Sequence, residues 1–487
     1  LEFADFEPEA GQTDGTLAHA IERMPFLSAE VAGFGWNFVS PQARKDKSIT
    51  TRDELLQALS EKRSFLLPPS ERQGYGSQVQ RAQFQKAHFK TKKTVELNTF
   101  LETDKRIELP STEKPLVSIV VVLFNSAELT YPFLLSLRQA MTVPAEVIIV
   151  DNASTDRTRE LLSRVDGAKI VLNDENEHFL RGSRRGAALA QGEFLLLVNN
   201  DTVLPSDCLE IATANFEDPG TGVVGAKIIL PDGSLQEAGS VIWSDGTCVG
   251  YGRGQNPNSP AFQFRREVHY CSGAFMMLRR SLYLELGGFD ERYAPAYYEE
   301  TDLCMKIRAA GYKVIYDPRI AIEHYEFGSA TVRQQAIDLQ ERNHKFFLAQ
   351  HATALKNHPS HEIGPRAALD SLRKKRVLMI DDRVPYRNLG AGYPRARDLV
   401  KAVSALGWDV TFYPLYFPGL DVDEFWSDFG PDIEVAAELG EPGLSGFLRE
   451  RAEEFDAVFV SRPGNMARVQ EVCGRAFLSR LKLIYDA

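Results

Sequence analysis

The chain has 487 residues, of which 44% are hydrophobic and 25% are charged. This composition is typical of a folded globular protein and excludes disorder, collagen and coiled coil as the state of the whole chain. Its 56 Lys and Arg against 67 Asp and Glu leave a net charge of −11. Because so acidic a chain offers no general basic face to phosphates, we expect no binding of nucleic acid. At roughly 100–200 residues per domain, the length predicts about three domains.

No run of the sequence approaches the ~20 apolar residues of a membrane-spanning helix. The acidic residues 1–10 lack the apolar core of a secretory signal. The five cysteines are scattered and form no CxxC pair, which argues against a disulfide framework and against a zinc knuckle. We therefore expect a cytoplasmic protein. Basic side chains within residues 81–93 leave a peripheral contact with the inner face of the membrane open, although a solvated helix face is the simpler explanation.

Residues 1–110 show no strong hydrophobic period, and we expect a mainly helical N-terminal extension there. Leu17–Met24 and Arg52–Arg63 have the pattern of short amphipathic helices. Residues 76–100 are polar and basic, with too few apolar positions for a core helix. Glu108–Pro115 contains two prolines and predicts a linker.

From Leu116 onward, apolar runs of strand length alternate with helical stretches. The runs are, in chain order, PLVSIVVVLFN, AEVIIVDNASTD, AKIVLND and GEFLLLVNNDT. The helices between them are expected at Leu129–Gln139, Thr155–Val165 and 183–191. This alternation predicts an open α/β sheet, in which ligands bind where the carboxyl ends of the strands meet loops. Asn125, Asp151 and Asn199–Asp201 follow such runs, so we expect them along one edge of the sheet.

Residues 346–372 are polar and predict a helical linker, after which residues 373–487 predict a second Rossmann-like unit. Its first run, KKRVLMIDD, indicates a strand, followed by a Gly-containing loop and a helix that ends at Gly407. The runs DAVFVSRPGN and LKLIYDA indicate further strands. The unit is short for a nucleotide-binding enzyme half with its partner, so we expect it to be part of a larger pair.

Two carboxylates at strand ends are candidates for ligand binding. Asp151 could accept a hydrogen bond from a base imide or a ribose hydroxyl, and the alternative is a capping role for the next helix. Asp201, which follows Asn200, could hold a divalent cation whose shell is completed by diphosphate oxygens and water. The alternative for this pair is an Asx turn.

Glu299, Glu300 and Asp302 stand close together in YYEETDLC. Three acids this close repel one another unless a cation, hydroxyl groups or a helix N-terminus receives them. They could supply a general base whose neighbouring carboxylate raises its pKa, and the alternative is that they favour a helix dipole. His324 stands in a polar context and is a candidate ligand, although a lone His is more often structural.

Two further segments could contact a ligand. In CSGAFMM, Gly273 and Ala274 remove side-chain bulk where a ligand could come close, and the alternative is a plain tight turn. In NEHFLRGSRRG, Arg184 could bind a diphosphate through its guanidinium, and the alternative is a solvated basic helix start.

The order and spacing of these motifs resemble the family 2 glycosyltransferases, which have the GT-A fold. The resemblance runs over residues 115–345, about half of the chain, through VSIVVVLFN, VDNASTD, GEFLLLVNNDT, YCSGAFMMLRR, LGGFDERY, YYEETDLC and IEHYEFGSA. The segments AGSVIWSDG and GGFDERYAPAYYEE look like those of bacterial enzymes that assemble O-antigen and other surface polysaccharides. Residues 373–487 are similar to the N-terminal Rossmann half of a family 4, GT-B glycosyltransferase. The whole therefore resembles a two-enzyme fusion truncated within its second enzyme.

The resemblance implies a role for each candidate residue. The nucleotide base and ribose would be held by Phe124, Asn125 and Asp151. The cation, Mn²⁺ or Mg²⁺, would be bound by Asp201 of a degenerate DxD motif and by His324, with Asn200 and Arg184 beside the diphosphate. Glu300 would be the catalytic base. The acceptor side would be lined by Gly273, Ala274, Glu299 and Asp302.

The activity implied is an inverting transfer of a sugar from UDP or dTDP to a hydroxyl of a glycan or a lipid-linked glycan. Three departures from the family pattern stand out. The DxD motif is NND here, and the ED motif is Glu-Glu. In NEHFLRGSRRG, His178 and Arg184 stand where relatives often carry Gly and Asn. The alternative is a non-catalytic carbohydrate- or partner-binding scaffold whose activity resides in the missing C-terminal enzyme. A dinucleotide-dependent dehydrogenase is disfavoured because neither unit has GxGxxG after its first strand.

Overall fold

The computed structural model describes residues 38–39, 48–49, 78–325, 333–373, 375–390, 392–416, 420–474, 478–479 and 482–486. The helices predicted at Leu17–Met24 and Arg52–Arg63 lie outside these residues. The chain divides into two compact units. One comprises Leu1–Lys105 with Ala127–Leu129, and the other comprises Arg106–Ser126 with Thr130–Ala487.

The described part of the first unit contains two short strands and one long helix. Strand β1 (Phe38–Val39) pairs antiparallel with β2 (Ser48–Ile49), and helix α5 spans Gln78–Leu101. Leu97, Phe100 and Leu101 are buried, and their spacing of three and four residues places them on one face of the last turns of α5. Residues 76–100 were expected to hold too few apolar positions for a core helix, yet the end of this helix is buried.

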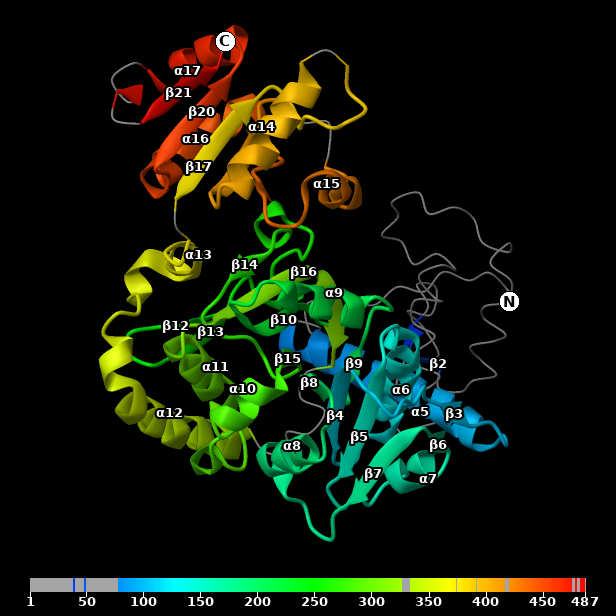
Figure 1. The fold of residues 1–487 in the computed structure, drawn as a ribbon. Helices are drawn as coiled ribbons and strands as arrows, with labels where there is room; N and C mark the ends of the chain where they lie inside the picture. The colour runs from blue at the N-terminus through cyan, green and yellow to red at the C-terminus, as the bar shows by residue number, and fades with distance from the viewer. Residues whose placement is uncertain are drawn as a thin grey trace. The chain divides into compact units, whose positions relative to one another are not determined.

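The second unit is built on a ten-stranded sheet with the order β14-β16-β10-β15-β8-β4-β5-β7, to which β11 and β9 add at β10 and β16 (Figure 1). Strands β4, β5, β7 and β8 run parallel, whereas β15 is antiparallel to both of its neighbours. The bounds are β4 Val117–Leu123, β5 Ala145–Asp151, β7 Ala168–Leu172, β8 Phe194–Asn199, β9 Thr202–Val203, β10 Thr221–Ile229, β11 Leu235–Ala238, β14 Arg266–Glu267, β15 Phe275–Arg279 and β16 Lys313–His324. The predicted α/β fold is confirmed, and its sheet is mixed.

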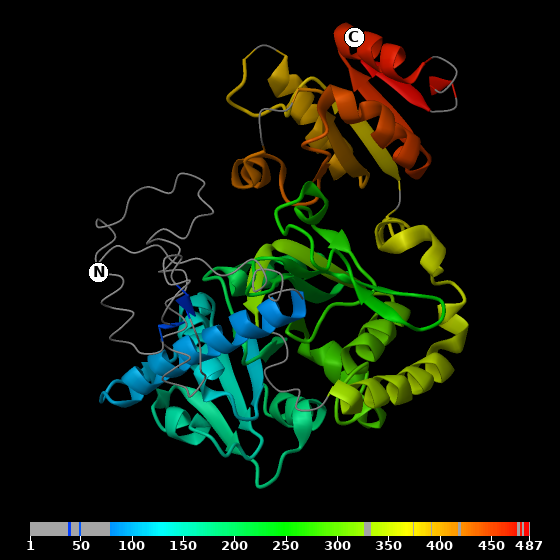
Figure 2. The same cartoon turned by 180° about the vertical axis from the view of Figure 1, so that it is seen from behind.

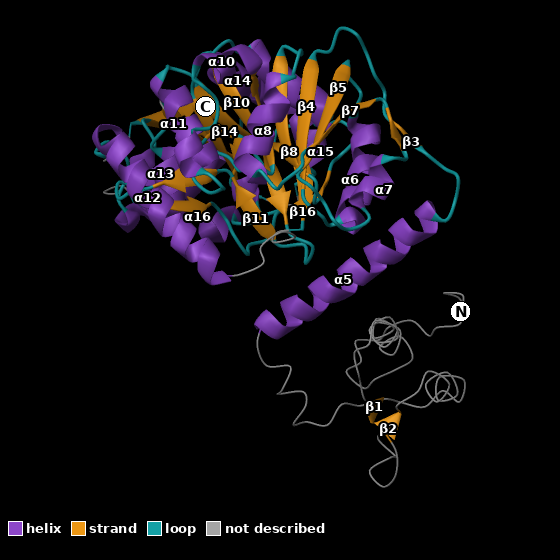
Figure 3. Cartoon of the chain, turned by 90° about the horizontal axis from the view of Figure 1, so that it is seen from below, coloured by secondary structure: helices purple, strands orange, loops and turns teal. Residues whose placement is uncertain are grey.

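Helices pack against this sheet, as the colouring by secondary structure shows (Figure 3). They are α6 Ala127–Ala140, α7 Thr158–Leu162, α8 His178–Ala188, α9 Cys208–Ala214, α10 Arg280–Glu285 and α11 Glu299–Ala309. Helix α8 lies so close to β4 that a Cβ atom on Gly186 would sit 2.3 Å from Cγ1 of Val120. The helix predicted at 183–191 begins five residues earlier, at His178. It needs glycine at position 186, where it crosses β4, because any side chain there would collide with Val120.

Smaller strand pairs flank the sheet. Strand β3 (Ile107–Glu108) pairs with β6 (Val165–Asp166), so the segment predicted to be a linker starts inside a strand. Strand β12 (Ser240–Ile242) pairs with β13 (Cys248–Gly250). In the part of the chain that the structure describes, we find no helix with the length and apolarity required to cross a bilayer.

Strand β16 carries an irregularity that matters for its carboxyl end. It runs parallel to β10, but Ala226 pairs with Asp317 whereas Lys227 pairs with Ala321. Strand β16 therefore has three more residues than β10 between these two pairs. Beyond this excursion, β16 also pairs antiparallel with β9, and His324 is the partner of Thr202.

Helices α12 (Arg333–Leu355) and α13 (Gly364–Asp370) follow the sheet. The yellow-green α12 lies beside the green segment that contains α10 and α11 in the front view and from behind (Figure 2). Phe347, Leu355, Ala368 and Leu369 belong to the same buried cluster as the strands of the sheet. The segment predicted to be a helical linker is helical, but its apolar face is part of the core because these residues recur at helical spacing.

Residues 375–486 contain a parallel five-stranded sheet in the order β19-β18-β17-β20-β21. Its elements are β17 Arg376–Asp381, α14 Tyr393–Ala405, β18 Asp409–Pro414, α15 Val422–Phe429, β19 Glu434–Val435, α16 Gly440–Arg451, β20 Ala457–Ser461, α17 Pro463–Cys473 and β21 Leu483–Asp486. Alternate residues of β17 enter separate apolar clusters on its two faces. Gly407 follows α14 with φ 79°, which is the predicted helix ending.

Candidate functional site

Strands β4, β5 and β8 of the first sheet end at one edge. Because β4 is the parallel neighbour of both β5 and β8, Asn125, Asp151 and Asp201 lie along this edge, as the sequence predicts. Strand β15 begins at the same edge, where the backbone N–H of Asn199 donates to the carbonyl oxygen of Ala274 at 3.3 Å. The edge thus brings together four of the predicted segments.

Asn125 joins the loops that follow β4 and β5. Its backbone N–H donates to Ser154 Oγ at 2.8 Å, and its side-chain Oδ1 accepts from the N–H of Thr155 at 2.7 Å. Its φ of 58° lies in the left-handed region, which Asn tolerates better than most residues. The amide oxygen is therefore occupied by the protein, and Asn125 shapes the predicted nucleotide loop from within.

Asp151 is completely buried at the end of β5. Its Oδ2 accepts from Arg159 Nε at 2.9 Å, and its Oδ1 accepts from the N–H of Ser154 at 3.2 Å. In contrast, 39% of the surface of Phe124 is exposed. Of the three residues predicted to hold the base and ribose, Phe124 is the one with an open face.

Asp201 and His324 meet although they come from distant parts of the domain. Nε2 of His324 lies 3.2 Å from Oδ1 of Asp201. The pairing of β16 with β9 brings them together, and the N–H of Tyr325 donates to the carbonyl oxygen of Asp201 at 2.9 Å. The two side chains are mostly buried. The geometry thus unites both residues predicted to bind the cation.

Gln236 of β11 orients the imidazole. Nδ1 of His324 lies 2.8 Å from Oε1 of Gln236, and an amide oxygen only accepts. In a neutral imidazole whose Nδ1 donates to Gln236, Nε2 is left as an acceptor, and it lies 3.4 Å from Asn199 Nδ2 as well as beside Asp201. A metal-binding His normally has such a partner on its second nitrogen, which fixes the tautomer and the ring plane.

The donor set fits Mn²⁺ or Mg²⁺ only in part. Among the described residues, no three His, Cys, Asp or Glu side chains gather closely enough to hold a cation by themselves. One carboxylate and one imidazole leave most of an octahedral shell open. Such cations are typically bound by few protein ligands together with substrate phosphates and water, and the pair suits that mode.

Each of the two acids that begin α11 has one buried oxygen without a hydrogen-bond partner. Oε2 of Glu299 and Oε2 of Glu300 are both inaccessible to water and have no hydrogen-bond partner within the described residues. Burial, together with a smaller contribution from the nearby carboxylate of Glu237, raises the pKa of Glu300 to about 7. Burial and the charge of Glu300 raise the pKa of Glu299 well above its ordinary value. A carboxylate with a pKa near neutrality is suited to general base catalysis.

Glu237 lies between the two parts of the site and was not singled out by the sequence. It stands next to Gln236 on β11, and its charge acts on both His324 and Glu300. Its Oε1 accepts from the N–H of Ser272 at 3.1 Å, and its Oε2 accepts from Ser240 Oγ at 3.1 Å. Its only sequence signal is a polar pair inside the short strand LQEA, which alone does not distinguish a buried acid from an exposed one.

Asp302 differs from its neighbours because protein groups surround its carboxylate. It is completely buried and forms an ion pair with Lys306 Nζ at 2.6 Å. Its Oδ1 accepts from Gln350 Nε2 and lies against His351 Nε2, both at 2.7 Å. Asp302 thus joins α11 to α12, and the acceptor contact that the resemblance implies stays a prediction.

Arg184 is likewise engaged by the protein. Its Nη1 donates to the carbonyl oxygen of Gly287 at 2.8 Å and to that of Phe289, and its Nε lies 3.4 Å from Glu291 Oε1. The predicted contact with a diphosphate would require these bonds to be given up. Its structural role is to tie α8 to the loop before α11.

The remaining predicted residues line the same edge. Asn200 Nδ2 donates to Thr130 Oγ1 at 2.8 Å, so its amide supports the turn before Asp201. A Cβ atom on Gly273 would sit 3.4 Å from Phe179, an ordinary contact distance. Ala274 is buried beside Asn199. The structure therefore shows a close turn here, without showing that its backbone needs glycine.

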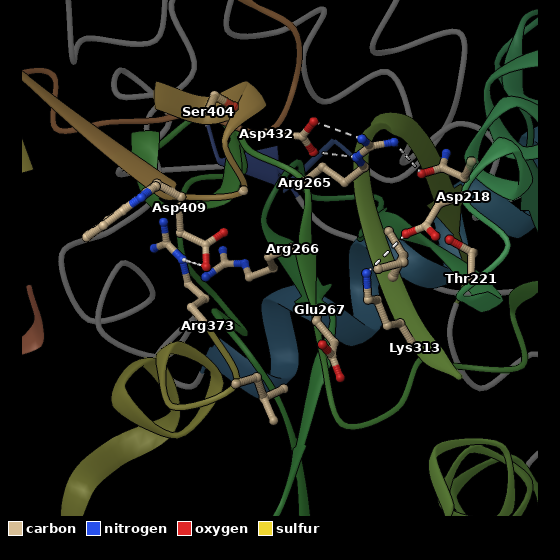
Figure 4. Close-up of a pocket in the computed structure, with 15 residues that line it drawn as sticks. Asp218, Thr221, Arg265, Arg266, Glu267, Lys313, Arg373, Ser404, Asp409 and Asp432 are labelled. Atoms are coloured by element: carbon tan, nitrogen blue, oxygen red, sulfur yellow. Dashed lines mark hydrogen bonds and ion pairs between the residues drawn. The ribbon is translucent and has the colours of Figure 1, made fainter. Parts of the chain in front are cut away.

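A hollow away from this edge is lined by acidic and basic side chains that pair with one another (Figure 4). Arg265 binds Asp432 through two hydrogen bonds of 2.6 and 2.8 Å. Lys313 Nζ lies 3.1 Å from Asp218 Oδ2. None of Asp201, His324 and Glu300 lines this hollow. Its paired side chains indicate a structural contact, and we therefore place the candidate site at the edge of the first sheet.

Comparison with known proteins finds a glycosyltransferase family over part of this domain. Residues 118–287 match the family model described as "Glycosyl transferase family 2". The O-antigen biosynthesis protein RfbC of Myxococcus xanthus is 30% identical over 243 residues, which are 48% of this chain and 19% of that protein. The N-acetylglucosaminyl-diphospho-decaprenol L-rhamnosyltransferase of Mycobacterium tuberculosis is 26% identical over 43% of this chain and 75% of that protein.

The chain spans a quarter or less of the length of the first two curated relatives that it matches. Among solved structures, GalNAc-T7 with UDP, GalNAc and Mn²⁺ overlaps 50% of this chain and 51% of that chain, at 16% identity and a TM-score of 0.37. The family match covers the segment from β4 to the loop after α10, which contains Asp201 and Glu237 but ends before Glu300 and His324.

Proposed function

We propose that residues 115–345 form an inverting, metal-dependent glycosyltransferase. It would move a sugar from a UDP- or dTDP-sugar to a hydroxyl of a glycan acceptor in the synthesis of a bacterial surface polysaccharide. The observation that carries the proposal is the meeting of Asp201 and His324 at the carboxyl edge of a sheet whose residues match a glycosyltransferase family. Two relatives are named for O-antigen biosynthesis and for rhamnosyl transfer to a lipid-linked sugar, and these names support a glycan acceptor.

In this mechanism Asp201 and His324 would hold Mn²⁺ or Mg²⁺. When bound, such a cation stabilises the negative charge that develops on a leaving nucleoside diphosphate. Gln236 keeps the Nε2 atom of His324 available by holding the proton on Nδ1. Asp201 supplies the single full negative charge, since the two residues before it are Asn.

Glu300 would remove the proton from the acceptor hydroxyl as that oxygen attacks the anomeric carbon. The bond from the anomeric carbon to the diphosphate oxygen breaks in the same displacement, so the configuration inverts and no covalent enzyme intermediate forms. The pKa of about 7 lets Glu300 be a carboxylate at neutral pH and still bind a proton readily. Glu299, one residue earlier and with a buried oxygen that has no hydrogen-bond partner among the described residues, would face the acceptor.

The nucleotide would lie on the loops after β4 and β5. Phe124 offers an exposed aromatic face for a base, and Asn125 holds the two loops together. Asp151 would contact the base or ribose only if Arg159 gave up part of its hydrogen bonding. This arrangement favours Phe124 as the main contact.

The test is isothermal titration of UDP and of dTDP, each with and without Mn²⁺, against the wild-type chain and Asp201→Ala. We expect one nucleotide to bind in a Mn²⁺-dependent manner and Asp201→Ala to abolish that dependence. Exposed Asp156→Asn on the same edge is the matched control, because it removes one carboxylate near the predicted nucleotide loops without touching the cation pair.

The nucleotide that binds names the donor class and defines the sugars to screen for transfer. Absence of binding by both nucleotides under every metal condition would contradict the catalytic assignment. It would favour the alternative in which these residues form a carbohydrate- or partner-binding scaffold.

A further inference from the structure

We propose that Asn343 of helix α12 is a positioning residue for Glu299 and Glu300. It gathers the carbonyl oxygens of the loop that precedes α11 and thereby sets where the two carboxylates lie. The consequence for the reaction rests on the proposed function, whereas the control of the loop by α12 stands on the contacts alone. Neither the sequence motifs nor the family match, which ends at residue 287, includes Asn343.

Asn343 is completely buried, and its amide faces backbone carbonyls. Nδ2 donates to the carbonyl oxygens of Tyr293, Ala296 and Tyr297 at 2.9, 2.8 and 2.9 Å. An NH₂ group has only two hydrogens, so the three acceptors share them. One side chain thus closes the loop on itself just before α11 begins at Glu299.

Arg342 fixes which way the amide of Asn343 points. Oδ1 of Asn343 accepts from Arg342 Nε at 3.0 Å and from Nη2 at 2.8 Å. The same Nη2 donates to the carbonyl oxygen of Ala294. With its oxygen held by a cation, the amide directs its nitrogen to the loop, and two adjacent residues of α12 bind four carbonyl oxygens of residues 293–297.

The loop held in this way is strained. Tyr297 and Tyr298 have φ values of 77° and 75°, in the left-handed region that large side chains avoid. Residues in such conformations cost about 1–3 kcal/mol each and persist only where surrounding contacts impose them. The contacts of Asn343 impose the first, and Tyr298 is held by its ring against Phe347 at 5.1 Å between centroids.

The contacts come from one face of α12. Asn343, Phe347, Gln350 and His351 are spaced by three or four residues, so they lie on the same side of the helix. Phe347 packs on Tyr298, whereas Gln350 and His351 bind Asp302 in the first turn of α11. This face of α12 therefore contacts the chain before and after Glu299 and Glu300, and the two glutamates lie between these contacts.

The backbone matters here because the hydrogen bonds that act on these carboxylates come from backbone groups, those of Tyr297 and Glu299 for Glu299 and that of Glu300 for Glu300. Oε2 of each glutamate has no hydrogen-bond partner within the described residues. Their positions therefore depend on where α11 begins. In an active site, a shift of about 1 Å can cost on the order of 100-fold in rate, so releasing the loop should reduce the chemical step.

The experiment compares Asn343→Asp with Glu341→Gln and the wild-type chain. Asn343→Asp keeps the shape and removes both N–H donors, and Glu341→Gln changes an exposed residue of the same helix. Hydrogen exchange of residues 293–303 measures the loop directly, and donor-nucleotide binding together with transfer rate measures the site. Asn343→Gln, which keeps the NH₂ group, tests rescue.

We expect Asn343→Asp to accelerate exchange in 293–303 at least tenfold, while α14 and β17 of the second sheet stay protected. We also expect kcat to fall by about 10- to 100-fold with donor KM within twofold, and Asn343→Gln to recover part of the loss. If exchange and kcat match those of Glu341→Gln, the proposal is overturned.

Two further outcomes separate this inference from the proposed function. If the wild-type chain transfers no sugar but Asn343→Asp still accelerates exchange in residues 293–303, the control of the loop by Asn343 is supported and the proposed function fails. If Asn343→Asp loses donor binding together with activity, or loses protection throughout the second unit, its role is general folding and the positioning role is overturned.

Discussion

The two ends of the candidate site are built in opposite ways. At the cation end, side chains place one another, since Asp201 lies against His324 and Gln236 holds the second nitrogen of the imidazole. At the acid end, the backbone places the side chains. Oε2 of Glu299 and Oε2 of Glu300 have no hydrogen-bond partner among the described residues, and the loop before them is bound to α12. The comparison teaches that contacts between side chains set the cation end, whereas contacts of α12 with the backbone set the acid end.

The largest effect is expected from Glu300→Gln, which removes the base and keeps the shape. We expect kcat to fall by about 10²- to 10⁴-fold, the usual contribution of a general base. Nucleotide binding should stay within a few-fold, because Glu300 does not touch Asp201 or His324. Transfer assays and nucleotide titration on one preparation check both statements. An unchanged kcat would remove Glu300 from the mechanism and turn attention to Glu299.

The pH dependence of the wild-type chain should show the same contrast. Because burial raises the pKa of Glu300 to about 7 and the base must be deprotonated, kcat should rise with pH up to about 7 and then level. Below that pH we expect roughly a tenfold loss per unit. The folded state holds this proton more tightly than the unfolded chain, so this group lowers stability as pH rises from its ordinary value to about 7.

That stability slope should be absent in Glu300→Gln, and urea unfolding at several pH values would measure it. A rate that is flat between pH 5 and 8 would mean that the site does not raise the pKa of its base. The carboxylate of Glu300 would then have groups that stabilise its charge, as the side chains at the cation end have.

The smallest effect on the reaction is expected from Gln236→Leu, which leaves both cation ligands in place. Loss of a partner that orients a metal-bound imidazole typically weakens metal affinity by about 10- to 100-fold. We expect the concentration of Mn²⁺ for half-maximal nucleotide binding to rise by that factor, with kcat at saturating Mn²⁺ nearly unchanged. If the Mn²⁺ dependence does not move, the hydrogen bond of Gln236 is structural only.

Much of the first sheet is predictable because its strands are buried on both faces. The runs around Val117–Leu123 and Ala145–Asp151 contain almost nothing but β-branched and other apolar residues, and they form β4 and β5 as expected. Their parallel pairing then places Asn125 and Asp151 on one edge without further information. Helix α8 was less predictable at its start, because its first turn is bound by distant segments: Asn152 Nδ2 donates to the carbonyl oxygen of His178, and the N–H of Leu180 donates to that of Pro295.

Contacts between distant segments could not be predicted from the pattern alone. The meeting of Asp201 with His324 depends on the register between β9 and β16, which no local signal encodes, and it was expected only through the family resemblance. The contacts of Asp302 and Arg184 within the protein were not predicted, for the same reason. Each found a partner from another element, His351 for Asp302 and the 287–291 loop for Arg184, that a reading of neighbours cannot supply.

The excursion in β16 has a consequence for how chain length acts as information. Between its pairs with Ala226 and Lys227, β16 contains Pro318, Arg319 and Ile320 in addition to the paired residues. Side chains alternate along a strand, so removing one residue there, with the register before it kept, would bring Tyr325 to the place of His324. The number of residues in this excursion therefore decides whether an imidazole faces Asp201. Their kind matters as well, because Ile320 is completely buried and Arg319 Nη2 binds Asp317 Oδ2 at 2.6 Å. A homologue that keeps this chemistry would keep the length of the excursion and an apolar residue at its end.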